Sequence, residues 1–410
     1  MIRIDARVLA TCDGSDDSPT AALDLRERAS VGIEGERIVY LGPTEHAPVA
    51  DEVHEVGCVL PGFVDPHTHL VFGGSRVDEF RRRMGGEDYR TLAKEGGGIA
   101  STVRATRASS DDALFELGRA RLSALSGFGV TSVEIKSGYG LDVETELRIL
   151  RVARRLGTLG LARVTTSFLG AHALPPGETD RSRYVREVIE AQLPRVVAEG
   201  LADTVDVYCD EGAFSLQETR AILGAAKAAG LATRAHIGQF ADLGGAELLA
   251  ELGARSGDHL EQVDDAGLAA MAKAGVVGVF LPGAWRTLRQ TPPEADRFRQ
   301  AGVAMAIGTD LNPGTSPTAN LPLMAALAVR DAGFTIEEAI LGITRVAAQA
   351  AGFTEKESAS GRLRVGGPAD LCGFEISDPA ALGYAFGDLR ASVAMMAGSF
   401  ATVASIPRLW

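Results

Sequence analysis

The sequence has few cysteines, little positive charge and no long apolar run, and each shortage excludes a class of protein. Only four cysteines occur in 410 residues, far apart and without a C-x-x-C pair, so a disulfide-rich secreted scaffold is not expected. Lysine and arginine number 41 against 54 aspartate and glutamate, and the net charge of −13 argues against a nucleic-acid partner. No uncharged apolar run reaches the ~18 residues of a membrane span, and no signal-peptide pattern is visible. We therefore expect a cytoplasmic protein that contacts neither nucleic acid nor membrane.

The middle of the chain has the pattern of an α/β protein. Short β-branched runs alternate with longer amphipathic stretches, and in residues 112–122 leucines recur at near-helical spacing. Eight candidate strands can be counted, which is the number in a closed (β/α)8 TIM barrel. They lie at 58–65, 130–135, 163–169, 204–208, 232–236, 255–259, 276–280 and 303–308. The rival architecture, a doubly wound open sheet, lacks its usual glycine fingerprint.

The two ends of the chain have a different pattern from the middle. Residues 1–60 hold short apolar stretches broken by glycine-containing turns, and residues 362–410 return to strand-like sequence. We expect these two segments to form one small β-sandwich domain together. The barrel would then occupy residues 61–361.

Histidine is scarce, and its distribution is informative. Of seven histidines, five fall at or just after the end of a predicted strand, namely His67, His69, His172, His236 and His259. The carboxyl ends of barrel strands all face one mouth, so residues there converge even when they are distant in sequence. The sequence therefore predicts one site that contains five histidines.

Part of this set has the composition of a metal site. His67 and His69 are two residues apart on an extended segment, so their side chains point the same way and can reach one ion. His236 and Asp310 end later strands and offer two further ligands. Three histidines and one carboxylate leave positions open for water and substrate, as catalytic sites require. The alternatives are surface histidines in a turn, a hydrogen-bonded core histidine at 236 and a capping aspartate at 310.

Longer motifs resemble one family throughout the chain. They are HTHLVFGGSR (67–76), EGGGIASTVRATR (95–107), EIKSGYGL (134–141), FLGAHALP (168–175), FLPGAWRTLRQT (280–291) and TDLNPGTSPT (309–318). Together they resemble the imidazolonepropionase family of the metal-dependent amidohydrolase superfamily. The resemblance implies hydrolysis of the small molecule 4-imidazolone-5-propanoate to N-formimino-L-glutamate in histidine degradation. It also implies one zinc or iron ion per chain, with manganese left open, and a homodimer.

The resemblance also assigns roles in catalysis. It implies that His67, His69, His236 and Asp310 hold the metal, and that hydroxide formed on the ion attacks the ring carbonyl. We expect Asp310 to move the proton to the leaving nitrogen and His259 to stabilise the oxyanion. Gln239 stands where the family uses Glu or Gln near the ring, and whether Gln239 or Asp310 is the main proton acceptor stays open.

A second group is expected to bind the substrate. The family places an arginine at the position of Arg76, whose fixed charge suits the propionate. The other matching positions are Tyr139, His172, Gln239, Asn312, Gly314 and Thr315. In the segment 312–315, backbone N–H groups with the Asn and Thr side chains would cradle an anion, although Asn-Pro-Gly-Thr is also a good turn.

Three alternatives remain beside this interpretation. Lys136 could bridge two metals as in binuclear relatives, although pairing with a neighbouring carboxylate is the simpler expectation. Another cyclic-amide hydrolase or a deaminase could use the same metal, but a nucleobase does not require a carboxylate clamp at Arg76. A non-enzymatic binder with a structural metal is disfavoured, because structural sites fill all four positions with protein ligands.

Overall fold

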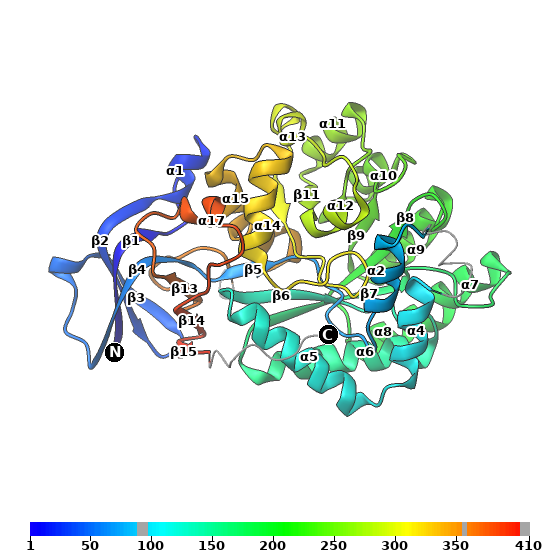
Figure 1. Cartoon of the computed structure of the whole chain (residues 1–410), viewed down its shortest axis with the longest axis horizontal. Coiled ribbons are helices and arrows are strands. Elements are labelled where there is room, and N and C mark those ends of the chain that lie inside the picture. Colours follow the sequence, from blue (N-terminus) through cyan, green and yellow to red (C-terminus); the bar gives the residue numbers. More distant parts are fainter. Residues whose placement is uncertain (88–96, 355–358, 402–410) are drawn as a thin grey trace.

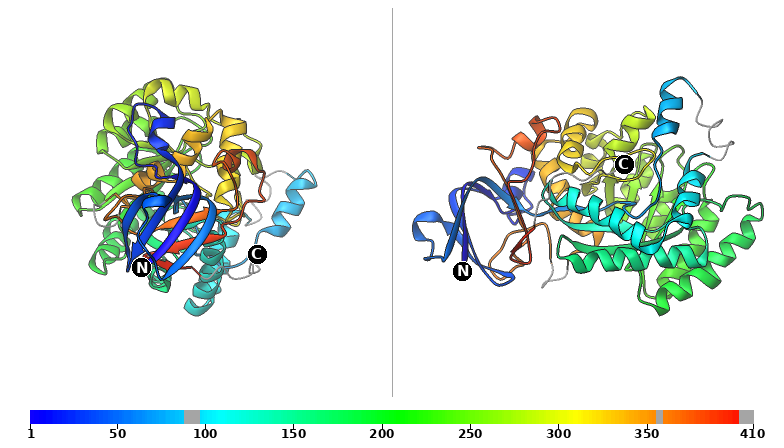
Figure 2. Two further views of the ribbon diagram at one scale, coloured as in Figure 1. Left: turned by 90° about the vertical axis from the view of Figure 1, so that its left-hand side faces the viewer. Right: turned by 60° about the horizontal axis from the view of Figure 1, so that its bottom comes forward.

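A computed structural model describes residues 1–87, 97–354 and 359–401 of the chain. Residues 95 and 96 of the motif at 95–107 lie outside this part, as do residues 402–410 of the expected small domain. Figure 1 shows a sheet built from both ends of the chain beside a larger body of strands and helices. Figure 2 shows that this sheet caps one end of the larger body.

The larger body is a parallel barrel, as predicted. Its sheet has the order β12-β11-β10-β9-β8-β7-β6-β5, and every neighbouring pair is parallel. Beyond the strand ends, Thr68 forms a parallel bridge to Leu311, and the Asp310 N–H donates to the His67 carbonyl at 3.0 Å. These contacts join the first and last strands and bring the segments that carry His67, His69 and Asp310 together. The strands are β5 (Phe63–Asp65), β6 (Val130–Lys136), β7 (Arg163–Ala171), β8 (Thr204–Cys209), β9 (Ala232–Ile237), β10 (Ser256–His259), β11 (Val277–Phe280) and β12 (Met305–Ile307).

Helices surround the barrel and follow its strands. The expected helix at 112–122 is α5, which begins after Ser110, whose hydroxyl accepts from the Ala113 N–H at 3.2 Å. Its leucines Leu114 and Leu122 are fully buried. Within the described residues, the helices of this body are α2 (Val77–Met84), α4 (Ile99–Ala108), α5 (Asp111–Ser126), α6 (Val143–Leu156), η2 (Gly157–Leu159), α7 (Arg181–Glu187), η3 (Val188–Gln192), α8 (Leu193–Ala198), α9 (Leu216–Ala228), α10 (Gly245–Leu252), α11 (Asp265–Ala274), α12 (Pro282–Leu288), α13 (Ala295–Ala301), α14 (Leu321–Leu327), η4 (Ala328–Ala332), α15 (Ile336–Gly342) and α16 (Arg345–Ala351).

The first predicted strand, 58–65, is wrong as a single element. The chain runs through β4 (Glu52–Pro61) in the small sheet, and only the three residues of β5 enter the barrel. Gly62 lies between them, and a Cβ atom there would be 2.0 Å from Thr131 Oγ1 on β6. Gly62 therefore leaves room for the Thr131 side chain at the point where the chain passes from one sheet to the other, and hydrophobic pattern alone does not reveal this change.

The second sheet confirms that both ends of the chain build one β unit. Its order is β15-β14-β13-β4-β1-β2-β3, with β1 parallel to β4 and the other pairs antiparallel. An isolated bridge joins Arg37 to Pro368, so the sheet curls around its own buried core. The remaining elements here are β1 (Ile2–Ala10), α1 (Pro19–Leu23), β2 (Leu25–Glu34), β3 (Arg37–Pro43), η1 (Thr44–His46), β13 (Leu371–Phe374), α17 (Ala381–Tyr384), β14 (Val393–Met396) and β15 (Ser399–Phe400).

No helix within the described ranges is both long and apolar enough to cross a membrane.

The junction at Gly62 gives a stability prediction. Gly62→Ala places a methyl group against Thr131, and overpacking of this kind costs about 1–3 kcal/mol. Urea unfolding should therefore show a lower midpoint for this variant. Gly224→Ala is the matched control, because a Cβ at this position in α9 meets nothing within 4 Å. The control should gain about 0.5–1 kcal/mol from its helix propensity, and equal midpoints for the two variants would contradict the packing argument.

Candidate metal and substrate site

The five strand-end histidines meet at the mouth of the barrel. The ring centroid of His67 is 4.6 Å from that of His236, and that of His69 is 5.0 Å from that of His172. The His259 ring lies 5.5 Å from His236. The other two histidines, His46 and His54, belong to the small β unit. The predicted convergence is therefore present.

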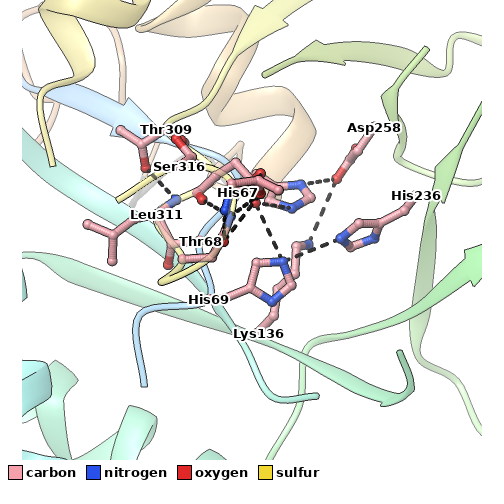
Figure 3. A network of polar contacts seen from close by, with 12 residues as sticks. His67, Thr68, His69, Lys136, His236, Asp258, Thr309, Leu311 and Ser316 are labelled. Carbon is pink, nitrogen blue, oxygen red and sulfur yellow. Dashed lines mark hydrogen bonds and ion pairs between the residues drawn. The ribbon is translucent and has the colours of Figure 1, made fainter. Parts of the chain in front are cut away.

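Three of these rings direct nitrogen atoms at one point. His67, His69 and His236 are buried, and their ligand atoms all lie within 4.8 Å of one another. His236 Nε2 is 3.4 Å from His69 Nε2, and Asp310 Oδ1 is 3.5 Å from His67 Nε2 and 3.6 Å from His69 Nε2. Ligands about 2.1 Å from an ion at tetrahedral angles are about 3.4 Å apart, so the spacing fits a single metal. Figure 3 shows His67, His69 and His236 around this point.

The state of the nitrogens also fits a metal. Burial lowers the pKa of His67 and of His69 well below the usual histidine value, so both rings are neutral and offer a lone pair. His67 Nε2 is buried and has no hydrogen-bond partner among the described residues. Burial raises the pKa of Asp310 to about 6. A divalent cation would supply the missing partner for these atoms.

Two carboxylates orient the rings of His67 and His236 through their Nδ1 atoms. His67 Nδ1 donates to Asp258 Oδ2 at 2.6 Å, and His236 Nδ1 donates to Asp206 Oδ1 at 3.0 Å. Each bond places the proton on Nδ1 and leaves the Nε2 lone pair for an ion. Sequence reasoning missed both aspartates. The available signal was a charged residue inside a strand expected to be buried.

Buried cations balance these carboxylates. Lys136 Nζ lies 2.7 Å from Asp206 Oδ2 and 3.1 Å from Glu134 Oε1. Arg234 Nη2 pairs with Asp258 Oδ2. All five side chains are at most 1% exposed. The expected pairing of Lys136 with a carboxylate is therefore confirmed, and within the described ranges one histidine cluster, not two, fits a metal.

A pocket of about 300 Å³ opens above the histidines. Of the residues expected at the site, it is lined by His69, Arg76, Tyr139, His172, His236, Gln239, His259, Asp310, Asn312 and Thr315. Tyr208 and Arg83 also line it, and sequence reasoning missed them. The sequence did contain a signal for Arg83, because it follows Arg76 by two helical turns and so lies on the same face of α2.

Arg76 is held at the start of α2. Its Nε donates to Glu79 Oε2 at 2.9 Å, and the residue is only 8% exposed. The guanidinium lies against Gly314, where a Cβ would be 2.0 Å from Nη1. Gly314 therefore gives room for Arg76 and does not itself line the pocket.

The segment 312–315 differs from the expected anion cradle. The N–H groups of Gly314 and Thr315 already donate to Asn312 Oδ1, at 2.7 and 2.8 Å. This is an Asx turn, the alternative interpretation of the motif. The two backbone donors are thus occupied, while the side chains of Asn312 and Thr315 reach the pocket.

The second wall of the pocket carries Tyr139 and His172. Glu146 shapes the loop around Tyr139, because its carboxylate accepts from the N–H groups of Gly138 and Gly140 at 2.9 and 2.7 Å. His172 Nδ1 donates to the Gly138 carbonyl at 2.9 Å, and its ring stacks on His69. The loop that carries Tyr139 and the ring of His172 are therefore held by contacts within the protein.

Gln239 is oriented by its neighbours. The Tyr208 hydroxyl donates to Gln239 Oε1 at 2.6 Å, and the Gln239 backbone N–H donates to Asp210 Oδ2 at 2.7 Å. Because the side-chain oxygen is engaged, the amide presents N–H donors to the pocket.

Comparison with known proteins agrees with this geometry. Residues 58–403 match the amidohydrolase family. Imidazolonepropionases of Shewanella putrefaciens (strain CN-32 / ATCC BAA-453) and Shewanella sp. (strain ANA-3) are each 46% identical to the chain. The matches cover 92% of this chain and 93% of the first relative, and 94% of both chains for the second.

Solved structures with lower identity share the fold. An adenosine deaminase from Xanthomonas campestris with bound zinc has a TM-score of 0.72 at 16% identity, covering 97% of this chain and 92% of that one. A 5-methylcytosine deaminase from Klebsiella pneumoniae has a TM-score of 0.72 at 14% identity, covering 97% and 96%. The family match over residues 58–403, together with the 46% identity to curated relatives, shows that the chain belongs to the amidohydrolase family and is a hydrolase that acts on C–N bonds. Within it, the chain belongs to the imidazolonepropionases.

The carboxylates behind the ligands give a prediction about metal retention. Asp258→Asn weakens the acceptor of the His67 Nδ1 proton, and such changes typically lower metal affinity 10–100-fold. Competition of the metal-loaded protein against a chelator measures the effect. Glu294→Gln, an exposed residue without a capping bond, should retain the metal like the unchanged protein. Equal retention in Asp258→Asn would contradict the orienting role.

Proposed function

We propose that the chain hydrolyses the ring amide of 4-imidazolone-5-propanoate to N-formimino-L-glutamate. The observation that carries the proposal is the combination of a buried three-histidine cluster with Asp310 and a pocket wall that presents Arg76. The first arrangement suits water activation, and the second suits a substrate with a carboxylate tail. The 46% identity to imidazolonepropionases supports the same substrate.

His67, His69, His236 and Asp310 would hold one zinc or iron ion per chain. Such an ion polarises a carbonyl and lowers the pKa of water toward about 7. We assign the ion as zinc or iron because imidazole with carboxylate suits both. A homodimer and a cytoplasmic location belong to the same proposal.

Asp310 is the proton carrier in this proposal. It takes a proton from the attacking water and delivers it to the ring nitrogen that leaves, so that the C–N bond breaks and a carboxylate forms. One oxygen of Asp310 faces the histidines, while the other is 3.5 Å from Thr315 Oγ1. Gln239 is the weaker choice, because an amide is not basic and its oxygen already accepts from Tyr208.

The remaining pocket residues hold and polarise the substrate. His259 faces the carbonyl oxygen and stabilises the negative charge that develops on it. Arg76 pairs with the propionate, while Tyr139 and His172 hydrogen-bond to the ligand. Asn312 and Thr315 add side-chain contacts at the same wall. Deamination of a nucleobase-like ring, the alternative activity, would leave the buried Arg76 without an anionic ligand group.

The direct test is turnover. Freshly generated 4-imidazolone-5-propanoate should lose its ultraviolet absorbance with the purified, metal-loaded protein, and N-formimino-L-glutamate should form. Absence of turnover by the metal-loaded protein would refute this substrate and direct the search to other cyclic amides and to deaminase substrates.

Removal of metal-site residues should abolish the reaction. His67→Ala and Asp310→Asn each delete a group that the mechanism requires, and we expect less than a few per cent of the unchanged activity. Initial rates at saturating substrate measure this. Higher residual activity in either variant would exclude the proposed mechanism.

Loss of Arg76 should act mainly on binding. Arg76→Ala should raise KM, with a cost of about 2–5 kcal/mol if the arginine pairs with a desolvated carboxylate. Steady-state kinetics separates KM from kcat. Arg81→Ala, on the same helix but with a side chain 75% exposed, should leave both constants unchanged. If Arg76→Ala lowers kcat and leaves KM unchanged, Arg76 does not bind the substrate carboxylate as proposed.

A further inference from the structure

A buried carboxylate, Glu261, lies behind His259 and has no role in the mechanism so far. Its side chain is fully buried, and neither of its oxygens has a hydrogen-bond partner among the described residues. Glu261 Oε1 is 3.8 Å from His259 Nδ1, which also lacks a hydrogen-bond partner there. Within the described ranges, His259 is the one basic side chain at ion-pair distance from Glu261.

The backbone between the two residues is unusual. His259, the last residue of β10, has φ of 82°, and Leu260 has φ of 76°. Residues other than glycine rarely adopt this left-handed backbone conformation, and two such residues in succession are costly. The turn that they make brings Glu261 back against the ring that ends the strand. A strained backbone of this kind persists where the surrounding structure requires one geometry.

Burial of a carboxylate is also costly unless a charged or hydrogen-bonding partner compensates it. Three other buried cations near the site already pair with carboxylates. Arg234 pairs with Asp258, Lys136 with Asp206 and Glu134, and Arg76 with Glu79. The ring of His259 is therefore the available partner for Glu261. An imidazole that directs Nδ1–H at a carboxylate presents Nε2 on its opposite side.

We propose that Glu261 is a positioning residue that holds the His259 ring with Nδ1 toward its carboxylate and Nε2 toward the substrate carbonyl. The distance of 3.8 Å between Glu261 Oε1 and His259 Nδ1 is an ion-pair distance, so the carboxylate favours a ring with Nδ1–H directed at it. The inference rests on the proposed function, because it gives His259 its orientation for that reaction. The positioning role explains why the Glu261 carboxylate is buried away from water beside a strained turn.

A double-mutant cycle tests the proposal. Glu261→Gln, His259→Asn and the double variant are compared in kcat, KM and metal content. We expect Glu261→Gln to lower kcat on the order of 10-fold or more, with little change in KM and unchanged metal content. In the His259→Asn background the same substitution should have no further effect, because Glu261 acts through His259. The proposal would be overturned if Glu261→Gln had the kcat of the unchanged protein, or if the losses of the two single variants multiplied in the double variant.

Two controls keep the result interpretable. Glu247→Gln, an exposed carboxylate on α10, should match the unchanged protein in all constants. Nitrogen NMR of 15N-histidine-labelled protein gives a readout without turnover, with the His259 signals assigned by their loss in His259→Asn. In Glu261→Gln these signals should shift while those of the other histidines stay, and unchanged His259 signals would overturn the proposal.

The cycle also separates this proposal from the proposed function. If the unchanged protein does not turn over 4-imidazolone-5-propanoate, the proposed function fails, and the NMR signals of His259 still decide whether Glu261 orients the ring. If the unchanged protein is active and Glu261→Gln matches it, only the role of Glu261 fails.

Discussion

The buried charge network behind the histidines is the constraint on which the site depends. Three carboxylates and two cations, from Glu134 and Lys136 on β6, Asp206 on β8, Arg234 on β9 and Asp258 on β10, are almost completely removed from water. Buried charges are tolerated only when each finds its partner, so a shift in the register of any of these strands would leave an unpaired charge. The network therefore fixes the strands and the orientation of two histidine rings together.

This network also explains how the barrel holds the histidine rings in fixed orientations. The ring of His67 is hydrogen-bonded to Asp258 and that of His236 to Asp206. His69 and Asp310 belong to the segments that close the barrel. Above them, side chains that line the pocket are held by local contacts, as Arg76 is by Glu79. In the proposed function, the deep part of the site carries out the chemistry and the rim binds the substrate carboxylate.

Much of the site could be predicted, because the ends of parallel strands must converge. This rule located His67, His69, His236 and Asp310 from residues far apart in sequence. The partners Asp206 and Asp258 were not predicted, since pairing across strands is a tertiary property. A glycine at 62 splits an apolar run between two sheets, and the Asx turn at Asn312 occupies donors that the motif offered to a ligand. In these cases a local pattern is compatible with two structures, and packing selects one.

X-ray absorption at the metal edge tests the central claim most directly, because it reports the ligands without a need for turnover. On the purified protein, with metal content measured on the same sample, we expect about one zinc or iron ion per chain with nitrogen and oxygen neighbours. The multiple scattering should be that of about three imidazoles. A second metal about 3.5 Å away, sulfur ligands, or failure of the metal-supplied protein to retain an ion would contradict the account.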